Sequence, residues 1–274
     1  MAVRRSTLRR RVLTVVGILA AVYFALCVAA RLIYPSVLFP APRVDRAPDA
    51  LATKLVDLPE DDGSASAMAL WYPPPNDTAR VVVFFHGNGE TIFDDAPLAE
   101  TLAAEGLGVM LVEYRGYGIT YGTSPTERSL YDDGEAAMNK LHRSFGIPNE
   151  RIGIWGVSLG TSIASEMARR GHGTRLALVA PFTSIVDVAK RKVPWLPMSL
   201  VMKHQLDTLS RAKDIAQPTL VVHGDQDELV PFDMGETLSR AIPHGRLMRI
   251  AGGHHNDVLT ADVVSAIALH LLEK

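Results

Sequence analysis

The sequence has little cysteine and almost no excess of charge, and both shortages limit what the chain can be. Of its 274 residues only Cys27 is a cysteine, so no intramolecular disulfide can form and the fold depends on its hydrophobic core. With 28 basic and 30 acidic side chains the formal charge is −2, which argues against a nucleic-acid-binding protein. The chain contains neither an H-E-x-x-H motif nor a G-x-x-x-x-G-K-[ST] phosphate loop. We therefore expect no nucleic acid, no metal ion and no cofactor.

Acidic residues are also missing from positions 1–44, which carry seven arginines, whereas residues 45–274 hold 21 basic and 30 acidic side chains. Within the basic segment, residues 12–30 form 19 consecutive positions without a charge. As a helix this run would span roughly 28 Å, close to the hydrocarbon thickness of a bilayer. We predict a transmembrane anchor at 12–30, preceded by a cytoplasmic basic segment at 1–11.

The flanking charges predict how the anchor is oriented. Five arginines lie within the first 11 residues, and such a cluster favours a cytoplasmic N-terminus with the rest of the chain outside the cell membrane. The alternative is a cleaved signal peptide, because Val28-Ala29-Ala30 has small residues where a peptidase could act; the protein would then be exported. Residues 31–50 contain four prolines and are expected to form a juxtamembrane connector that cannot stay helical for long.

The rest of the chain alternates between strand-like and helix-like segments and is expected to form one domain, 51–274. Apolar, β-branched runs predict strands at 81–85, 108–114, 151–155, 176–180, 219–222 and 246–250. Helix-length segments lie between them, at 94–105, 126–145, 159–170, 233–241 and 257–272. This alternation predicts an α/β fold with a mostly parallel sheet and helices on both faces. A hairpin of 53–58 and 66–72, joined by the turn-rich 60–64, is expected at the sheet edge, and a small cap is expected at about 181–217.

A G-x-S-x-G motif at 156–160 follows the strand at 151–155 and precedes a helical segment. In that context the two glycines allow a cramped turn that exposes the Ser158 hydroxyl, which marks Ser158 as a candidate nucleophile. The N–H of Leu159 and those of the turn around Asn88 are candidates for an oxyanion hole. His86, in the same turn, is expected to be a structural, hydrogen-bonded residue.

A serine nucleophile needs a base and an orienting carboxylate, and candidates for both follow later strands. Asp225 and Asp227 come after the strand at 219–222, and His254 and His255 come after the strand at 246–250. The spacing does not choose within either pair. A solvated acidic turn, a surface histidine pair and a metal cluster are the competing interpretations.

Six segments together resemble the α/β-hydrolase superfamily, and within it the Bem46-like group that includes the membrane-anchored ABHD13-type and ABHD17-type serine hydrolases. They are HGNGE (86–90), EYRGYG (113–118) followed by SPTE (124–127), GVSLG (156–160), APFTSI (180–185), HGDQDELVP (223–231) and GGHHND (252–257). The resemblance covers roughly residues 50–272. Glu113 stands where this group commonly has aspartate, which is expected to affect only local hydrogen bonding.

The resemblance implies a Ser-Asp-His triad in which Asp227 and His255, rather than Asp225 and His254, accompany Ser158. It implies hydrolysis of an ester or thioester bond in a small-molecule or lipid substrate by a monomer. Further substrate contacts are expected at Gly89, Tyr117 and Trp195. The alternatives are a serine peptidase or amidase on the same fold, and a membrane-tethered binding protein that has lost catalysis.

Overall fold

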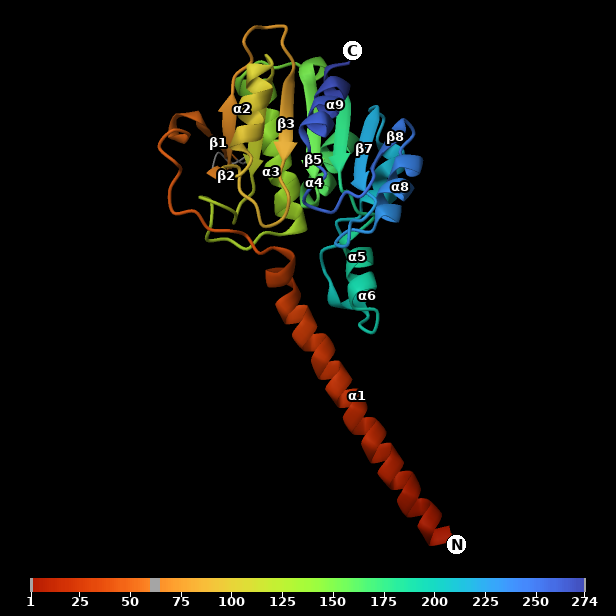
Figure 1. The fold of residues 1–274 in the computed structure, drawn as a ribbon. Coiled ribbons are helices and arrows are strands. Elements are labelled where there is room, and N and C mark those ends of the chain that lie inside the picture. Colours follow the sequence, from red (N-terminus) through yellow and green to blue (C-terminus); the bar gives the residue numbers. More distant parts are fainter. Residues whose placement is uncertain (1, 60–64, 274) are drawn as a thin grey trace.

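An eight-stranded sheet organises the chain that follows a long N-terminal helix in the computed structural model, which describes residues 2–59 and 65–273 (Figure 1). The strand order is β1-β2-β4-β3-β5-β6-β7-β8; β1 with β2 and β2 with β4 are antiparallel, and the other neighbours are parallel. The strands are β1 Leu55–Pro59, β2 Ala65–Tyr72, β3 Val81–Phe85, β4 Gly108–Glu113, β5 Ile152–Val157, β6 Arg175–Val179, β7 Thr219–Gly224 and β8 Gly245–Ile250. The predicted mostly parallel sheet is confirmed, with the hairpin at its edge; the expected turn at 60–64 lies outside the described residues.

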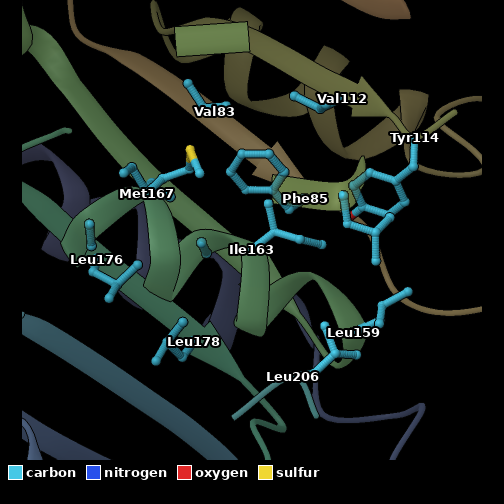
Figure 2. Close-up of a cluster of buried hydrophobic side chains, with 14 of the residues drawn as sticks. Val83, Phe85, Val112, Tyr114, Leu159, Ile163, Met167, Leu176, Leu178 and Leu206 are labelled. Carbon is cyan, nitrogen blue, oxygen red and sulfur yellow. The ribbon is translucent and has the colours of Figure 1, made fainter. Parts of the chain in front are cut away.

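Both faces of the sheet are apolar, which explains why the central strands are continuous hydrophobic runs. Side chains alternate across a strand, and in β3 Val83 and Phe85 join the core on one face while Val82 and Phe84 join the core on the other. Figure 2 shows the first of these clusters, in which side chains of β3 and β4 pack against α4. Packing on both faces therefore holds the central strands in place, and with them the first residues of the loops that follow these strands.

Helices cover both faces. Buried residues of α3, α4 and α8 belong to one core cluster, and those of α2 and α9 belong to the other. The helices are α1 Ala2–Leu38, α2 Ala96–Ala104, α3 Glu127–Asn139, α4 Leu159–Arg169, α5 Ile185–Lys192, α6 Met198–Val201, α7 Thr208–Arg211, α8 Phe232–Ala241 and α9 Ala261–Leu272, with short helical turns η1 Ala52–Lys54, η2 Lys140–Ser144, η3 Asn149–Arg151 and η4 Ala212–Asp214.

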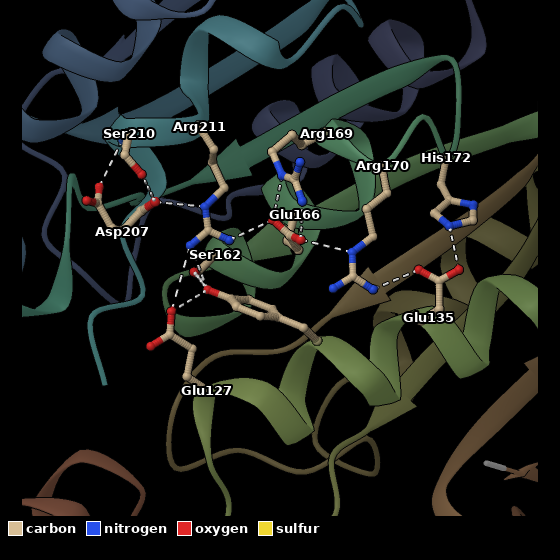
Figure 3. Close-up of polar contacts among 11 residues, drawn as sticks. Glu127, Glu135, Ser162, Glu166, Arg169, Arg170, His172, Asp207, Ser210 and Arg211 are labelled. Atoms are coloured by element: carbon tan, nitrogen blue, oxygen red, sulfur yellow. Dashed lines mark hydrogen bonds and ion pairs between the residues drawn. The ribbon is translucent and has the colours of Figure 1, made fainter. Parts of the chain in front are cut away.

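A network of polar and charged side chains joins the helices α3, α4 and α7 (Figure 3). The buried carboxylate of Glu166 accepts hydrogen bonds from Arg169, Arg170 and Arg211, at 2.7 to 3.0 Å. Burial raises the pKa of Glu166, but hydrogen bonds from Arg169 and Arg170 and the charge of Arg211 outweigh it and lower that pKa to about 2. The network fixes the helix that follows the Ser158 turn.

The helix α1 is long and apolar enough to cross a membrane over Arg9–Leu38, judged by length and composition, and its mean hydropathy reaches 2.6. It continues to Leu38, eight residues beyond the expected end of the anchor at residue 30. Pro35 lies in the last turn, so the backbone hydrogen bond that it cannot donate is lost near the end of the helix rather than in its middle. The cap helices α5 and α6 project from the domain on the same side as α1 (Figure 1).

Candidate active site

Ser158 stands where β5 turns into α4, on a backbone held in the left-handed region with a φ of 47°. Two glycines make this turn possible. A Cβ at Gly156 would lie 2.5 Å from the Gly160 carbonyl oxygen, and a Cβ at Gly160 would lie 2.0 Å from the Phe85 carbonyl oxygen. The strained turn projects the Ser158 side chain from the carboxyl end of β5, beside the turn that follows β3. These adjacent strands leave the middle of the sheet, where α/β proteins bind ligands.

His255 reaches Ser158 from the loop after β8. Its Nε2 lies 3.0 Å from Ser158 Oγ, and its Nδ1 lies 2.7 Å from Asp227 Oδ2. With the proton on Nδ1, the ring donates to the carboxylate and accepts from the serine hydroxyl. The three side chains thus form the hydrogen-bonded chain through which an imidazole can remove a proton from a serine.

Asp227 is held in place from several sides. Its Oδ1 accepts hydrogen bonds from the N–H groups of Leu229, at 2.9 Å, and Val230, at 2.7 Å, while His223 Nε2 lies 3.3 Å from its Oδ2. Burial raises the pKa of Asp227, but hydrogen bonds from His223 and His255 outweigh it and leave that pKa well below its usual range. The carboxylate is therefore charged at neutral pH and suited to stabilise a protonated His255. Sequence reasoning missed His223, whose signal was a histidine at the end of a buried strand.

The two rival residues have other partners. Asp225 Oδ2 accepts two hydrogen bonds from Arg249, at 2.8 and 2.6 Å, and its Oδ1 accepts from the N–H of Gly252 at 2.7 Å. The exposed His254 ring lies 3.0 Å from the Glu228 carboxylate, which raises the pKa of His254. Over residues 2–59 and 65–273, no group of three or more His, Cys, Asp or Glu side chains could hold a metal ion.

Asn88 and Leu159 both line the cavity that contains Ser158. Leu159 is the first residue of α4, so its N–H has no acceptor within the helix and lies at the positive end of the helix dipole. The side chain of Asn88 is fixed, because its Nδ2 donates to the Leu38 carbonyl at 2.6 Å and its Oδ1 accepts from the Tyr117 hydroxyl at 2.7 Å. Both residues therefore lie in the wall of the cavity that contains Ser158.

His86 is a buried structural residue at the start of this turn, as its sequence context suggested. Its Nε2 lies 3.1 Å from Glu113 Oε1, and its Nδ1 lies 2.8 Å from the Gly87 carbonyl oxygen. Burial alone would lower the pKa of His86, but the hydrogen bond and charge of Glu113 raise it overall. The pair ties the turn that carries Asn88 to β4.

The cavity has a volume of about 440 Å³ and a mainly apolar lining. Its walls come from α1 residues between 30 and 38, from the cap between 182 and 202, and from Leu229 and Val230. The expected contacts at Gly89, Tyr117 and Trp195 are not part of that lining. Tyr117 is fully buried and positions Asn88 instead, and Trp195 lies exposed on the cap.

The wall from α1 is the part of the site that sequence reasoning missed. The helical spacing was present at positions 30, 33, 34, 37 and 38, all apolar or aromatic. The four prolines at 31–50 predict a connector here instead of a helix. A helix that tolerates a proline in its last turn turns these five side chains toward the cavity.

Two family models match the chain. A model described as serine aminopeptidase S33 matches residues 76–205, and one described as alpha/beta hydrolase fold matches residues 178–262. An uncharacterized protein of Mycobacterium tuberculosis is 33% identical over 190 residues, which cover 68% of this chain and 67% of that protein. The lysophosphatidylserine lipase ABHD12 of Danio rerio is 31% identical over 195 residues, which cover 62% of this chain and 49% of the lipase.

Among solved structures, the Pyrococcus furiosus esterase Pf2001 superposes with a TM-score of 0.67. The match covers 84% of this chain and 97% of the esterase at 19% sequence identity, so it concerns the fold alone.

Proposed function

Because the chain belongs to the α/β-hydrolase superfamily, we propose that it is a serine hydrolase that cleaves ester or thioester bonds through an acyl-enzyme intermediate. The observation that carries the proposal is the hydrogen-bonded chain of Ser158, His255 and Asp227 beside an apolar cavity. The lipase among the similar proteins supports the same class of reaction.

In the first half of the reaction, the Ser158 hydroxyl gives its proton to His255 Nε2 as its oxygen attacks the acyl carbon. Asp227 stabilises the positive charge that forms on the imidazole. The negative oxygen of the tetrahedral intermediate accepts hydrogen bonds from the backbone N–H groups of Leu159 and Asn88. His255 then protonates the leaving alcohol or thiol, and the acyl group stays on Ser158. In the second half, water gives a proton to His255 Nε2 as its oxygen attacks the acyl carbon. The bond between the acyl carbon and Ser158 Oγ then breaks, His255 returns the proton to Ser158 Oγ, and the acid is released.

The cavity favours an ester or thioester with an apolar acyl group over a peptide with a free amino terminus. An aminopeptidase must pair the ammonium group of its substrate, usually with a carboxylate. No described residue that lines the cavity is acidic, and the charged side chain among them is the basic Lys192. We therefore prefer an esterase, lipase or thioesterase activity to the peptidase suggested by one family model.

The helix α1 supports a membrane-anchored form of this enzyme. We place the chain in the Bem46-like group on its six sequence segments together with this N-terminal helix. The arginines before the apolar run favour a cytoplasmic N-terminus and an extracytoplasmic hydrolase domain, 51–274. The cap contacts α1 as far back as Tyr23, within the apolar run, which favours retention of the helix over its removal as a signal peptide.

Ser158→Ala in the purified full-length protein tests the proposed chemistry. Turnover of p-nitrophenyl butyrate and labelling by a fluorophosphonate should both fall to background, while the thermal melt stays nearly unchanged, because the hydroxyl contributes little to packing. Ser165→Ala is the matched control: this hydroxyl is buried in the same α4 helix without a hydrogen-bond partner, so activity and labelling should persist. Ester turnover by Ser158→Ala would refute the mechanism, and a wild-type protein that neither reacts nor turns over would indicate a binding protein.

A further inference from the structure

The last turns of α1 carry a face unlike the rest of that helix. Five of its residues are spaced i, i+3, i+4, i+7 and i+8, the repeat of one helix face: Ala30, Ile33, Tyr34, Val37 and Leu38. All five line the cavity that contains Ser158. Leu38 and the following Phe39 are buried in the core of the hydrolase domain. The end of α1 is therefore one wall of the cavity as well as a connection to the domain.

The cap forms the opposite wall and is tied to the same helix. Hydrogen bonds at three positions of α1 join them. Tyr23 Oη donates to the Trp195 carbonyl at 2.9 Å, and the Lys203 N–H donates to Tyr34 Oη at 2.9 Å. Arg31 Nη1 donates to the Val201 carbonyl at 3.1 Å and to the Leu200 carbonyl at 3.4 Å. At 1.5 Å per residue, these contacts extend over roughly 16 Å of the helix. The cap thus lies alongside α1 instead of merely above its end.

The contacts between α1 and the cap determine how deep the cap would lie in a membrane that α1 crosses. The contact at Tyr23 falls within the uncharged run 12–30, so a bilayer crossed by that run also surrounds the neighbouring part of the cap. The cap presents large apolar side chains outward there: Trp195 is 59% exposed and Leu200 is 78% exposed. Exposed apolar surface of this kind, with a tryptophan near the end of a membrane-spanning segment, fits contact with lipid.

The cavity opens onto the outer surface of α1, within the stretch Arg9–Leu38 that is long and apolar enough to cross a membrane. Ile33 and Val37 line it and yet remain 58% and 72% exposed, so this wall continues onto the outer surface of α1. The volume of about 440 Å³ lies in the lower half of the range of ligand pockets, roughly 300–1,000 Å³. A cavity of that size with an apolar lining suits one acyl chain better than two.

We propose that the substrate is a single-chain acyl ester or thioester dissolved in the membrane, whose chain enters sideways from the leaflet between α1 and the cap and lies against residues 30–38. The inference rests on the proposed serine hydrolase activity. Ser158 attacks the acyl carbon at the inner end of the cavity, and hydrolysis then releases the fatty acid and the head-group alcohol or thiol.

The test uses two neighbouring positions on α1. Ile33→Trp places a bulky ring in the cavity, whereas Leu32→Trp places the same ring on a position that is 74% exposed and is not part of the lining. Each full-length variant is assayed in phosphatidylcholine vesicles with p-nitrophenyl laurate and p-nitrophenyl acetate. We expect the ratio of laurate to acetate kcat/KM to fall at least tenfold in Ile33→Trp and to stay within twofold of wild type in Leu32→Trp. The ratio does not depend on the fraction of folded enzyme.

Entry from the leaflet is tested by dilution of the substrate. At constant bulk laurate ester and increasing phosphatidylcholine, the wild-type rate should follow the mole fraction of ester in the bilayer. An unchanged ratio in Ile33→Trp, an equal fall in both variants, or a rate that follows bulk concentration alone would overturn the inference. If the wild type is active and Ser158→Ala is inactive, such results leave the proposed serine hydrolase function intact. If the wild type hydrolyses no ester at all, that function is refuted instead.

Discussion

The adjacent acids after β7 offer a sharp test of the triad. In Asp227→Asn the Oδ1 oxygen can still accept from the N–H groups of Leu229 and Val230, so the loop should keep its shape. The other atom becomes an amide that donates where the carboxylate accepted from His255 Nδ1. His255 must then carry its proton on Nε2, and that nitrogen can no longer accept from Ser158.

The size of the loss follows from this geometry. Without a proton acceptor next to Ser158, kcat/KM should fall by ~10³- to 10⁴-fold, or about 4 to 5.5 kcal/mol at 1.36 kcal/mol per tenfold change. Asp225→Asn is the matched control, because the contacts of Asp225 are with Arg249 and Gly252 rather than with the triad. Its loss should be about tenfold or less, from a loosened loop.

The adjacent histidines extend the test. His255→Ala should cost at least ~10³-fold in kcat/KM. His254→Ala removes an exposed ring that contacts Glu228 rather than the triad, and it should cost about tenfold or less. Asp227→Asn combined with His255→Ala should be little worse than His255→Ala alone, because the carboxylate acts only through the imidazole.

The assay is steady-state hydrolysis of p-nitrophenyl butyrate by full-length protein, with a thermal melt for each variant to show that it is folded. The reasoning is refuted if His254→Ala is the inactive variant, if Asp225→Asn loses more than Asp227→Asn, or if the double variant multiplies the two single losses.

Two further predictions concern stability and topology. Because the pKa of Glu166 is lowered to about 2 from 4.5, its stabilising effect should be present above pH 4.5 and lost as the pH falls toward 2. Urea unfolding should thus show Glu166→Gln less stable than wild type by up to about 3 kcal/mol at pH 7, with a difference that shrinks in acid; a difference independent of pH would contradict this. The prediction about topology is that the full-length protein stays with membranes after a carbonate wash. A reporter fused after Lys274 should be active only outside the cytoplasm. A shortened, washable form would indicate signal cleavage instead.

The fold could be read from the sequence because each central strand is apolar on both faces and ends at a glycine or polar turn. The runs at 81–85 and 219–222 correspond to β3 and β7, and the G-x-S-x-G motif lies at the end of β5 as its context indicated. The choice between Asp225 and Asp227 could not be read from spacing. It depends on which carboxylate turns toward Arg249 on the neighbouring strand, and cross-strand contacts of this kind leave no local pattern.

The expected substrate contacts were harder to predict, because an aromatic side chain at a strand end can point either way. Tyr117 follows β4 closely, but its ring packs against Tyr114 and His86 in the core, and only its hydroxyl reaches the site, through Asn88. The apolar neighbours of Trp195 in the sequence predict a place in the cavity, but its side chain lies exposed on the cap. The hydrophobicity of the sequence alone does not predict which way either side chain points.

The contact between Asn88 and Leu38 links the anchor to the chemistry. Asn88 belongs to the turn after β3, and the atom that its Nδ2 binds is a backbone carbonyl at the very end of α1. A helix C-terminus presents carbonyls that have no partner within the helix, so this hydrogen bond satisfies one of them and fixes Asn88 at the same time. The next residue, Phe39, is buried, and its ring packs against that of His204 in the segment between α6 and α7. The helix that would hold the protein in a membrane is thus also positioned to fix the turn that would bind the oxyanion.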